Sequence, residues 1–254
     1  MSGQRDDQHD STVDPNEVER YRALADMWWQ PDGRLWPLHV LNDLRTGAIR
    51  DALGRVRGLD PAAERPLTGL RMLDIGCGGG LLSEAMARLG AEVHGVDVVA
   101  SNIRVAELHA QESGLAVTYE TATAEAVAAR GERFDVVLNM EVVEHVADLP
   151  AFMHAVNTLV TPGGQTFVAT INRTLRSFVV AIVGAEYLFR ILPRGTHQWS
   201  RFPKPAEIEA LWRDGRIHVR ERTGVKVNPL NRRMWLSDSL SVNYMLLGER
   251  SSSG

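Results

Sequence analysis

Apolar and polar residues follow a regular order between residues 70 and 171, where short apolar runs alternate with segments that carry apolar residues every three or four positions. Runs of the first kind are typical of buried strands, and segments of the second kind are typical of amphipathic helices. The pattern predicts strands over 70–75, 92–97, 116–120, 134–140 and 165–171, and helices over 80–89, 100–113 and 150–160. Because strands and helices alternate, we expect a parallel sheet with helices on both faces.

Two segments flank this alternation. Before it, residues 18–29 and 38–56 have helical spacing, and a linker rich in proline and glycine continues to residue 69. After it comes a strongly apolar stretch with interspersed arginines, over residues 175–192. A further helix over 205–213 and two closing strands over 217–227 and 242–248 complete the pattern.

The prediction is a doubly wound α/β fold with a mostly parallel, seven-stranded sheet. We expect a single domain over residues 18–250, with an N-terminal helical cap over 18–69 and an insertion over 173–203. Residues 1–17 are acidic and polar and lack an apolar core, so a disordered tail is expected there. Additions of this kind to a common core usually carry substrate specificity.

A glycine loop links the first strand to its helix, with Gly76, Gly78 and Gly80 at alternate positions. Glycine permits a positive φ and lets a ligand lie directly against the main chain. The next strand ends in Asp97, 21 residues after Gly76, where an acid in βαβ nucleotide folds accepts hydrogen bonds from ribose hydroxyls. The sequence therefore predicts a nucleoside site, with a plain glycine turn as the alternative.

The loop also indicates which nucleoside is bound. A dinucleotide fingerprint needs glycine at position 81 and finds Leu81, and Asp74 adds negative charge two residues before Gly76. That charge would repel a pyrophosphate and would tolerate a cationic ligand. The cationic nucleoside is S-adenosylmethionine, and a nicotinamide dehydrogenase is disfavoured.

Composition narrows the class of protein. The chain has 254 residues, 44% of them hydrophobic and 24% charged, which is ordinary for a globular domain. A formal net charge of −4 argues against a nucleic-acid partner held by bulk electrostatics. One cysteine, Cys77, excludes an internal disulfide framework, and the start of the chain matches no secretory or transit signal. These features predict a cytoplasmic protein.

At this point the motifs together resemble class I S-adenosylmethionine-dependent methyltransferases, through the glycine loop, Asp97, the strand that enters Glu141 and the turn at 162–164. Further motifs resemble the bacterial ubiquinone biosynthesis O-methyltransferases: Trp28-Trp29, Pro37-Leu38-His39, Asn42, Arg45, and residues 140–146, 172–173, 184–187, 193–197 and 243–246. The resemblance covers roughly residues 20–247. Asp43 and Gln198 depart from that family's pattern, and neither lies in the glycine loop.

The resemblance implies that Arg45, Gly76, Asp97 and Met140 contact the cofactor S-adenosylmethionine. A guanidinium can grip the methionine carboxylate through two hydrogen bonds, although position alone would make Arg45 a solvated helix residue. Met140 ends a strand where an apolar side chain could pack on the adenine, or could equally be ordinary core. The site prediction also includes Asp74 and Gly78 of the same loop.

Three polar residues follow Met140 closely: Glu141, Glu144 and His145. If a helix began at the strand end, their spacing would place all three on one face. Two carboxylates and an imidazole could hold Mg²⁺, which would favour the phenolate of a catechol substrate. The alternatives are that His145 acts alone as the general base, or that Glu144 and His145 only line the pocket.

The resemblance implies O-methylation of ring hydroxyls on a polyprenylated phenol or quinol. Residues 175–192 are too short to span a bilayer, but their apolar residues and the arginines around them fit an interfacial helix on anionic lipid. The alternative is a lid over the substrate. We expect a cytoplasmic enzyme at the inner membrane, with other ubiquinone-biosynthesis proteins as partners. Rival functions are methylation of another small phenol and a catalytically silent binding subunit.

Overall fold

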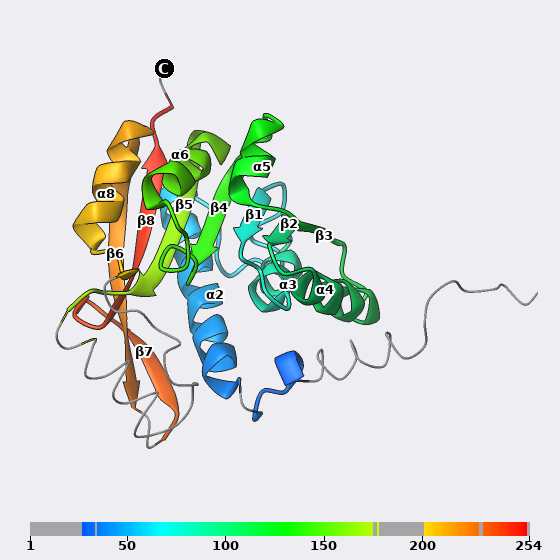
Figure 1. Ribbon diagram of the computed structural model, residues 1–254. Helices are drawn as coiled ribbons and strands as arrows, with labels where there is room; N and C mark the ends of the chain where they lie inside the picture. Colours follow the sequence, from blue (N-terminus) through cyan, green and yellow to red (C-terminus); the bar gives the residue numbers. More distant parts are fainter. Residues whose placement is uncertain (1–26, 34, 175–176, 178–200, 229–230, 253–254) are drawn as a thin grey trace, which may run out of the picture.

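The computed structural model describes residues 27–33, 35–174, 177, 201–228 and 231–252. Its centre is one sheet with the strand order β3-β2-β1-β4-β5-β8-β6-β7 (Figure 1). The strands are β1 (Arg71–Ile75), β2 (Glu92–Asp97), β3 (Val117–Thr121), β4 (Phe134–Met140), β5 (Val160–Ile171), β6 (Ile217–Asn228), β7 (Arg233–Ser237) and β8 (Asn243–Arg250). β1 to β5 pair in parallel, and β8 is antiparallel to both of its neighbours.

The helices are α2 (Trp36–Arg57), α3 (Leu81–Arg88), α4 (Ala100–Glu112), α5 (Ala124–Ala129), α6 (Leu149–Leu159) and α8 (Pro205–Asp214). α2 begins with a proline in its first turn and ends at Gly58, whose φ of 68° allows its N–H to bond the Gly54 carbonyl. In the part of the chain that the structure describes, no helix is both long and apolar enough to cross a bilayer.

Side chains alternate between the two faces of the sheet along each strand, and both faces carry buried apolar residues. In β1, Met72 packs with the buried residues of α2 and α3, whereas Leu73 and Ile75 pack with those of α5, α6 and α8. The predicted doubly wound fold is thus confirmed, and β2 and β4 have the predicted bounds. The two-sided packing leaves the carboxyl ends of β1, β2 and β4 at one edge, where such folds bind ligands.

The count of seven strands was wrong, because β7 pairs with β6 as an eighth strand at the edge of the sheet. Its sequence, Arg-Met-Trp-Leu-Ser, has only five residues, and its apolar residues are consecutive and do not alternate with polar ones, so periodicity does not reveal it. β5 also begins at Val160, five residues before the predicted start. The Pro-Gly-Gly segment expected to be a turn lies inside β5, where the pairing with β4 shifts register.

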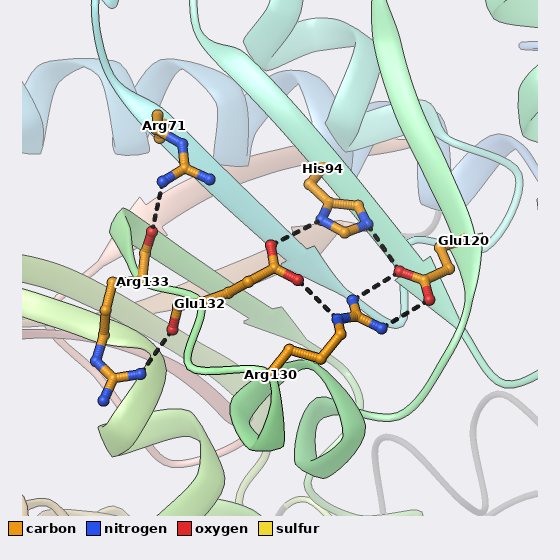
Figure 2. Close-up of polar contacts among 6 residues, drawn as sticks. All are labelled: Arg71, His94, Glu120, Arg130, Glu132 and Arg133. Atoms are coloured by element: carbon orange, nitrogen blue, oxygen red, sulfur yellow. Dashed lines mark hydrogen bonds and ion pairs between the residues drawn. The ribbon is translucent and has the colours of Figure 1, made fainter.

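A charged cluster ties the connection after α5 to β2 and β3 (Figure 2). Arg130 donates two hydrogen bonds of 2.8 Å to Glu120 and one of 2.8 Å to Glu132. His94 lies 3.3 Å from Glu120, and Arg71 stacks over the ring of Phe134 at 5.1 Å. The charged groups are partly exposed, so each pair contributes little to stability. The charged side chains of this cluster pair with one another.

Candidate active site

The glycine loop (residues 76–80) has the backbone that its sequence predicts. Gly76, Gly78 and Gly80 have φ values of 70°, 55° and 88°, a region that residues with a Cβ rarely adopt. Gly80 caps the start of α3, so the loop delivers the chain directly from the buried strand β1 into that helix. The turn brings bare main chain to the edge of the sheet.

The bare main chain of the loop is approached by side chains of the protein itself. A Cβ on Gly76 would lie 2.4 Å from Val142 Cγ2, and one on Gly80 would lie 2.5 Å from the Tyr119 hydroxyl. Cβ atoms on Gly78 and Gly79 would lie 2.8 and 2.7 Å from the indole of Trp28. The expectation that glycine leaves room for a ligand is therefore incomplete, because protein packing alone forbids larger residues.

Asp97 ends β2 directly beside the glycine loop. Its Oδ2 accepts a hydrogen bond of 3.0 Å from the Gly78 N–H, and its Oδ1 accepts one of 2.7 Å from the Val99 N–H. Two backbone donors orient the carboxylate, and each oxygen keeps a second lone pair that can accept from a ligand. The side chain lines a cavity, as a ribose-binding acid would.

That cavity has a volume of about 420 Å³ and runs over the carboxyl ends of β1, β2 and β4. Its walls are mostly apolar, and its lining includes Gly76, Asp97, Val98, Val142, His145 and Phe152. Cavities with apolar walls and a few convergent polar groups are the usual sites for small ligands. We refer to it as the larger cavity.

A smaller cavity of about 200 Å³ adjoins it, since Gly76 and Glu141 line both. Its other lining residues include Trp28, Asn42, Arg45, Asp74, Gly78 and Met140. Met140, for which an adenine contact and an ordinary core position were both open, lines this smaller and more charged cavity with Arg45. The two joined cavities offer one apolar and one charged compartment.

Arg45 projects from α2 into this site and forms an ion pair with Glu141. Its side chain is only 11% exposed, so the solvated surface position suggested by sequence alone was wrong. The pair joins residues 96 positions apart, and local periodicity carries no information about such a contact. A ligand carboxylate that binds Arg45 would have to share or displace Glu141.

Asp74 is buried at the end of β1 and accepts a hydrogen bond of 2.6 Å from the Ser83 hydroxyl. Burial raises the pKa of Asp74 to about 6, against the opposing effect of the Ser83 hydrogen bond, and the charge of Asp97 raises it further. Above that pH the smaller cavity contains a buried negative charge next to Glu141. A cationic ligand fits this potential.

The helix that would have placed the three polar residues on one face does not form directly after β4. Residues 141–145, which we call the acidic turn, form a turn in which the His145 N–H bonds the Val142 carbonyl at 2.8 Å. Glu141 itself has a φ of 58°, rare for a residue with a Cβ. Glu144 is buried and His145 is exposed, so the shared helical face on which the metal prediction depended is absent.

The electrostatics of the acidic turn centre on Glu144. Burial, and then the charge of Glu141, raise the pKa of Glu144 to about 9. Within the described residues, no group of three or more histidine, cysteine, aspartate or glutamate side chains is arranged to hold a metal ion. As placed, Glu141, Glu144 and His145 are therefore not a three-ligand magnesium site.

Two tryptophans, Trp28 and Trp29, contact the site although the sequence indicates no role for them beyond a family motif. The Trp29 indole N–H donates to the Gly79 carbonyl at 3.1 Å, and its ring stacks on His109 at 3.4 Å. Trp28 lies on the glycine loop, and its carbonyl bonds His39 at 2.8 Å. In the sequence, the one feature that could have indicated this contact is a pair of aromatic residues just before a turn that contains proline and glycine.

Cys77, in the glycine loop, is buried, and burial raises the pKa of its thiol, as expected of a packing residue and not of a nucleophile. Arg173, at the start of the predicted insertion, is paired with Glu207 of α8. The rest of the predicted lid or membrane segment, apart from Ser177, lies outside the described residues.

Comparisons with known proteins agree with this geometry. A family model described as a methyltransferase domain matches residues 45–215. Among solved structures, magnesium protoporphyrin IX methyltransferase from Synechocystis PCC 6803 with bound SAH has a TM-score of 0.62 at 20% identity, over 93% of this chain and 95% of that one. At this identity the likeness concerns the fold, which is the class I methyltransferase fold.

Curated relatives are far more similar. The chain is 52% identical to the ubiquinone biosynthesis O-methyltransferase of Chelativorans sp. (strain BNC1), over 94% of this chain and 95% of the relative. It is 53% identical to the protein of that name from Mesorhizobium japonicum, over 95% and 97%. Similarity of this degree over nearly the whole length decides the family. The chain belongs to the ubiquinone biosynthesis O-methyltransferases, a family of S-adenosylmethionine-dependent enzymes.

Proposed function

We propose that this chain methylates ring hydroxyls of two polyprenylated substrates, the catechol 2-polyprenyl-6-hydroxyphenol and 3-demethylubiquinol, with S-adenosylhomocysteine as the second product. The observation that carries the proposal is the near-full-length identity to ubiquinone biosynthesis O-methyltransferases. The joined cavities support it, because one is apolar and lined by Asp97 while the other contains Arg45 and Asp74.

In this proposal the two cavities divide the cofactor between them. Asp97 accepts the ribose hydroxyls beside Gly76 and Gly78, and Arg45 takes the methionine carboxylate near Met140. Asp74 supplies the negative charge that favours the cationic end. S-adenosylmethionine supplies a methyl group on a sulfonium, and the protein contributes mainly proximity and orientation for an in-line displacement.

The phenolic proton must leave before or during transfer, since a phenol with a pKa near 10 is a weak nucleophile at neutral pH. His145 is exposed and lines the larger cavity, so it is placed at the mouth of the site. We propose it as the catalytic residue that accepts this proton, with Glu141 supplying negative charge nearby and Glu144 contributing a protonated carboxyl group in the same turn.

Magnesium is a finer part of the proposal. The residues proposed as metal ligands, Glu141, Glu144 and His145, do not fit a metal ion as they are placed. Glu141 is already paired with Arg45, and Glu144 is buried. Ligation would require the Arg45–Glu141 pair to open when a carboxylate ligand takes Arg45. Excess chelator should lower turnover only if the pair opens in this way. Full activity in chelator, with no metal found by elemental analysis, would leave His145 as a base that acts without a metal.

We also propose that the enzyme works in the cytoplasm, on the surface of the inner membrane, where a polyprenylated substrate resides. Residues 175–192 are apolar, with Arg176 and Arg190 among them, which fits an interfacial segment on anionic lipid. In liposome flotation, Arg176→Glu with Arg190→Glu should lose binding to anionic vesicles and still methylate a short-chain substrate. Unchanged flotation would make the segment a lid only. Other ubiquinone-biosynthesis proteins are the proposed protein partners.

The deciding experiment is turnover on a demethylubiquinol analogue with methyl-labelled S-adenosylmethionine, with and without added magnesium. The proposal predicts labelled methoxy product from wild type and a large loss in His145→Ala with cofactor affinity retained. Label transfer only to an unrelated phenol would indicate a different substrate. Cofactor binding without transfer to any phenol would indicate a binding subunit.

A further inference from the structure

Trp28 is brought to the active site from a part of the chain outside the matched methyltransferase domain. It lies 17 residues before Arg45 and just ahead of α2. His39, in the first turns of α2, bonds its carbonyl at 2.8 Å, and the neighbouring Trp29 is fixed to the Gly79 carbonyl. The position of the Trp28 indole is therefore set by α2 and by the glycine loop together.

The clearest sign that the indole belongs there is Gly79. Unlike Gly78 and Gly80, this residue does not have a positive φ, so its backbone conformation does not require glycine. A Cβ at position 79 would lie 2.7, 2.8 and 3.0 Å from Trp28 Cδ2, Cγ and Cε3. Real Cβ atoms do not approach carbon so closely, and the three atoms nearest to this position all belong to the indole.

The same indole lines the smaller cavity together with Arg45, Asp74 and Glu141. The cavity therefore combines a guanidinium, two carboxyl groups and the π system of an indole. An aromatic ring attracts a cation through its quadrupole, and tryptophan does so best. Arg45 is already paired with Glu141. A cation that contacts the ring is therefore expected to come from the ligand.

We propose that Trp28 is a cofactor-specificity residue: its indole, seated on Gly79, closes the smaller cavity and favours a cationic ligand over a neutral one. This rests on the proposed function, in which the cavity takes the charged end of S-adenosylmethionine. S-adenosylhomocysteine keeps the same ammonium and carboxylate, so the ring separates cofactor from product through the sulfonium, the one charge that the product lacks. Release of the product would follow from loss of the attraction.

The test is calorimetric titration of both nucleosides against wild type, Trp28→Phe and Trp28→Leu. Trp28→Leu should weaken S-adenosylmethionine binding by about 3- to 30-fold and change S-adenosylhomocysteine binding by less than about 3-fold. Trp28→Phe keeps a π face and should fall between. Trp235→Leu, the same change at an exposed tryptophan on β7, is the matched control and should alter neither affinity.

Gly79→Ala gives a second, independent route, because the added methyl group must push the indole aside. It should reproduce the selective loss in wild type and add little in the Trp28→Leu background. Equal weakening of both nucleosides, or affinities unchanged in all variants, would overturn the proposal. Failure of wild type itself to bind S-adenosylmethionine would instead contradict the proposed function. Thermal melts without ligand identify any variant that fails to fold.

Discussion

The glycine loop after β1 and the acidic turn after β4 lie side by side at the carboxyl edge of the sheet, and they are built on different principles. The glycine loop is specified by space: Trp28, Val142 and Tyr119 fill the positions where its residues would carry a Cβ. The acidic turn is specified by charge: Glu141 pairs with Arg45, and Glu144 is buried beside Glu141.

The difference explains why one region was predictable and the other was not. A steric requirement that only glycine satisfies is visible in the local sequence as a glycine. A charge pair joins residues from distant elements, so the local sequence does not reveal it. The two regions nevertheless meet at one point, where Val142 of the acidic turn rests on Gly76 of the loop. Substitutions at these positions can separate the steric contribution from the electrostatic one.

The largest effect is expected from Gly76→Ala, which breaks the contact between the two regions. The new Cβ would lie 2.4 Å from Val142 in a backbone with a φ of 70°. Strain and overpacking together should lower the free energy of unfolding by about 3 kcal/mol and abolish cofactor binding. Chemical denaturation and calorimetry measure the two losses.

Gly58→Ala is the matched control, because Gly58 has a φ of 68° and nothing within 4 Å of its would-be Cβ. It should cost only about 1 kcal/mol, the conformational part alone. Similar losses at both glycines would mean that the contact with Val142 contributes nothing.

The next effect concerns the buried acid of the acidic turn. The folded-state pKa of Glu144, about 9, lies above its ordinary value, so the folded protein holds a proton that the unfolded chain releases. This costs stability above about pH 4.5, increasingly up to about pH 9. Glu144→Gln removes the cost and should stabilise the protein by up to about 3 kcal/mol at neutral pH.

Unfolding free energies of the two proteins should converge as the pH falls to about 4.5, where the unfolded carboxyl also binds its proton. A gain that is independent of pH would show that packing of the amide, and not ionisation, is responsible. A loss at neutral pH would contradict the burial of an uncompensated acid.

Asp97 is held beside the glycine loop by the hydrogen bond that it accepts from the Gly78 N–H. Asp97→Ala should weaken S-adenosylmethionine binding by about 2 kcal/mol, because ligand hydroxyls and the Gly78 N–H lose an ionised acceptor. Asp135→Ala is a control at the opposite end of the sheet, where that carboxylate accepts from the Arg71 N–H at 2.9 Å. The control should lower stability and leave cofactor affinity unchanged. Calorimetry showing equal affinities for Asp97→Ala and wild type would exclude a ribose contact.

The smallest effects should have opposite signs at the two ends of one ion pair. Arg45→Lys loses the forked grip on a carboxylate and should weaken cofactor binding by about 5- to 10-fold. Glu141→Gln removes the competitor for Arg45 and should tighten binding by about 2- to 3-fold. Calorimetric titration of both variants with S-adenosylmethionine tests whether Glu141 competes for Arg45. If both substitutions weaken binding, Glu141 supports the cofactor site directly.

Much of the fold was accessible from periodicity because the parallel strands are buried on both faces. The bounds of β2 and β4 were predicted residue by residue, and α2 was two residues longer at its start and one at its end. β7 was missed because it is an edge strand whose only neighbour is β6, so its side chains do not carry a two-sided apolar pattern.

The site divides in the same way. The left-handed glycines and the position of Asp97 follow from local sequence, since a strand, a turn and a strand end are each short-range features. The pairing of Arg45 with Glu141 and the seat of Trp28 on Gly79 join elements far apart in the chain. A helix over the acidic turn, the condition for a shared polar face, is absent because Glu141 leaves β4 with a positive φ, which cannot start a right-handed helix.

The place of β8 between β5 and β6 has a consequence for the biogenesis of the protein. β8 is synthesised after both of its neighbours, so an emerging chain presents β5 and β6 as two unpaired edges until β8 leaves the ribosome. Exposed edges of this kind recruit other chains. Translation that stalls or stops before Asn243 should therefore yield aggregates or substrates for chaperones, even though every residue of the glycine loop has already been made.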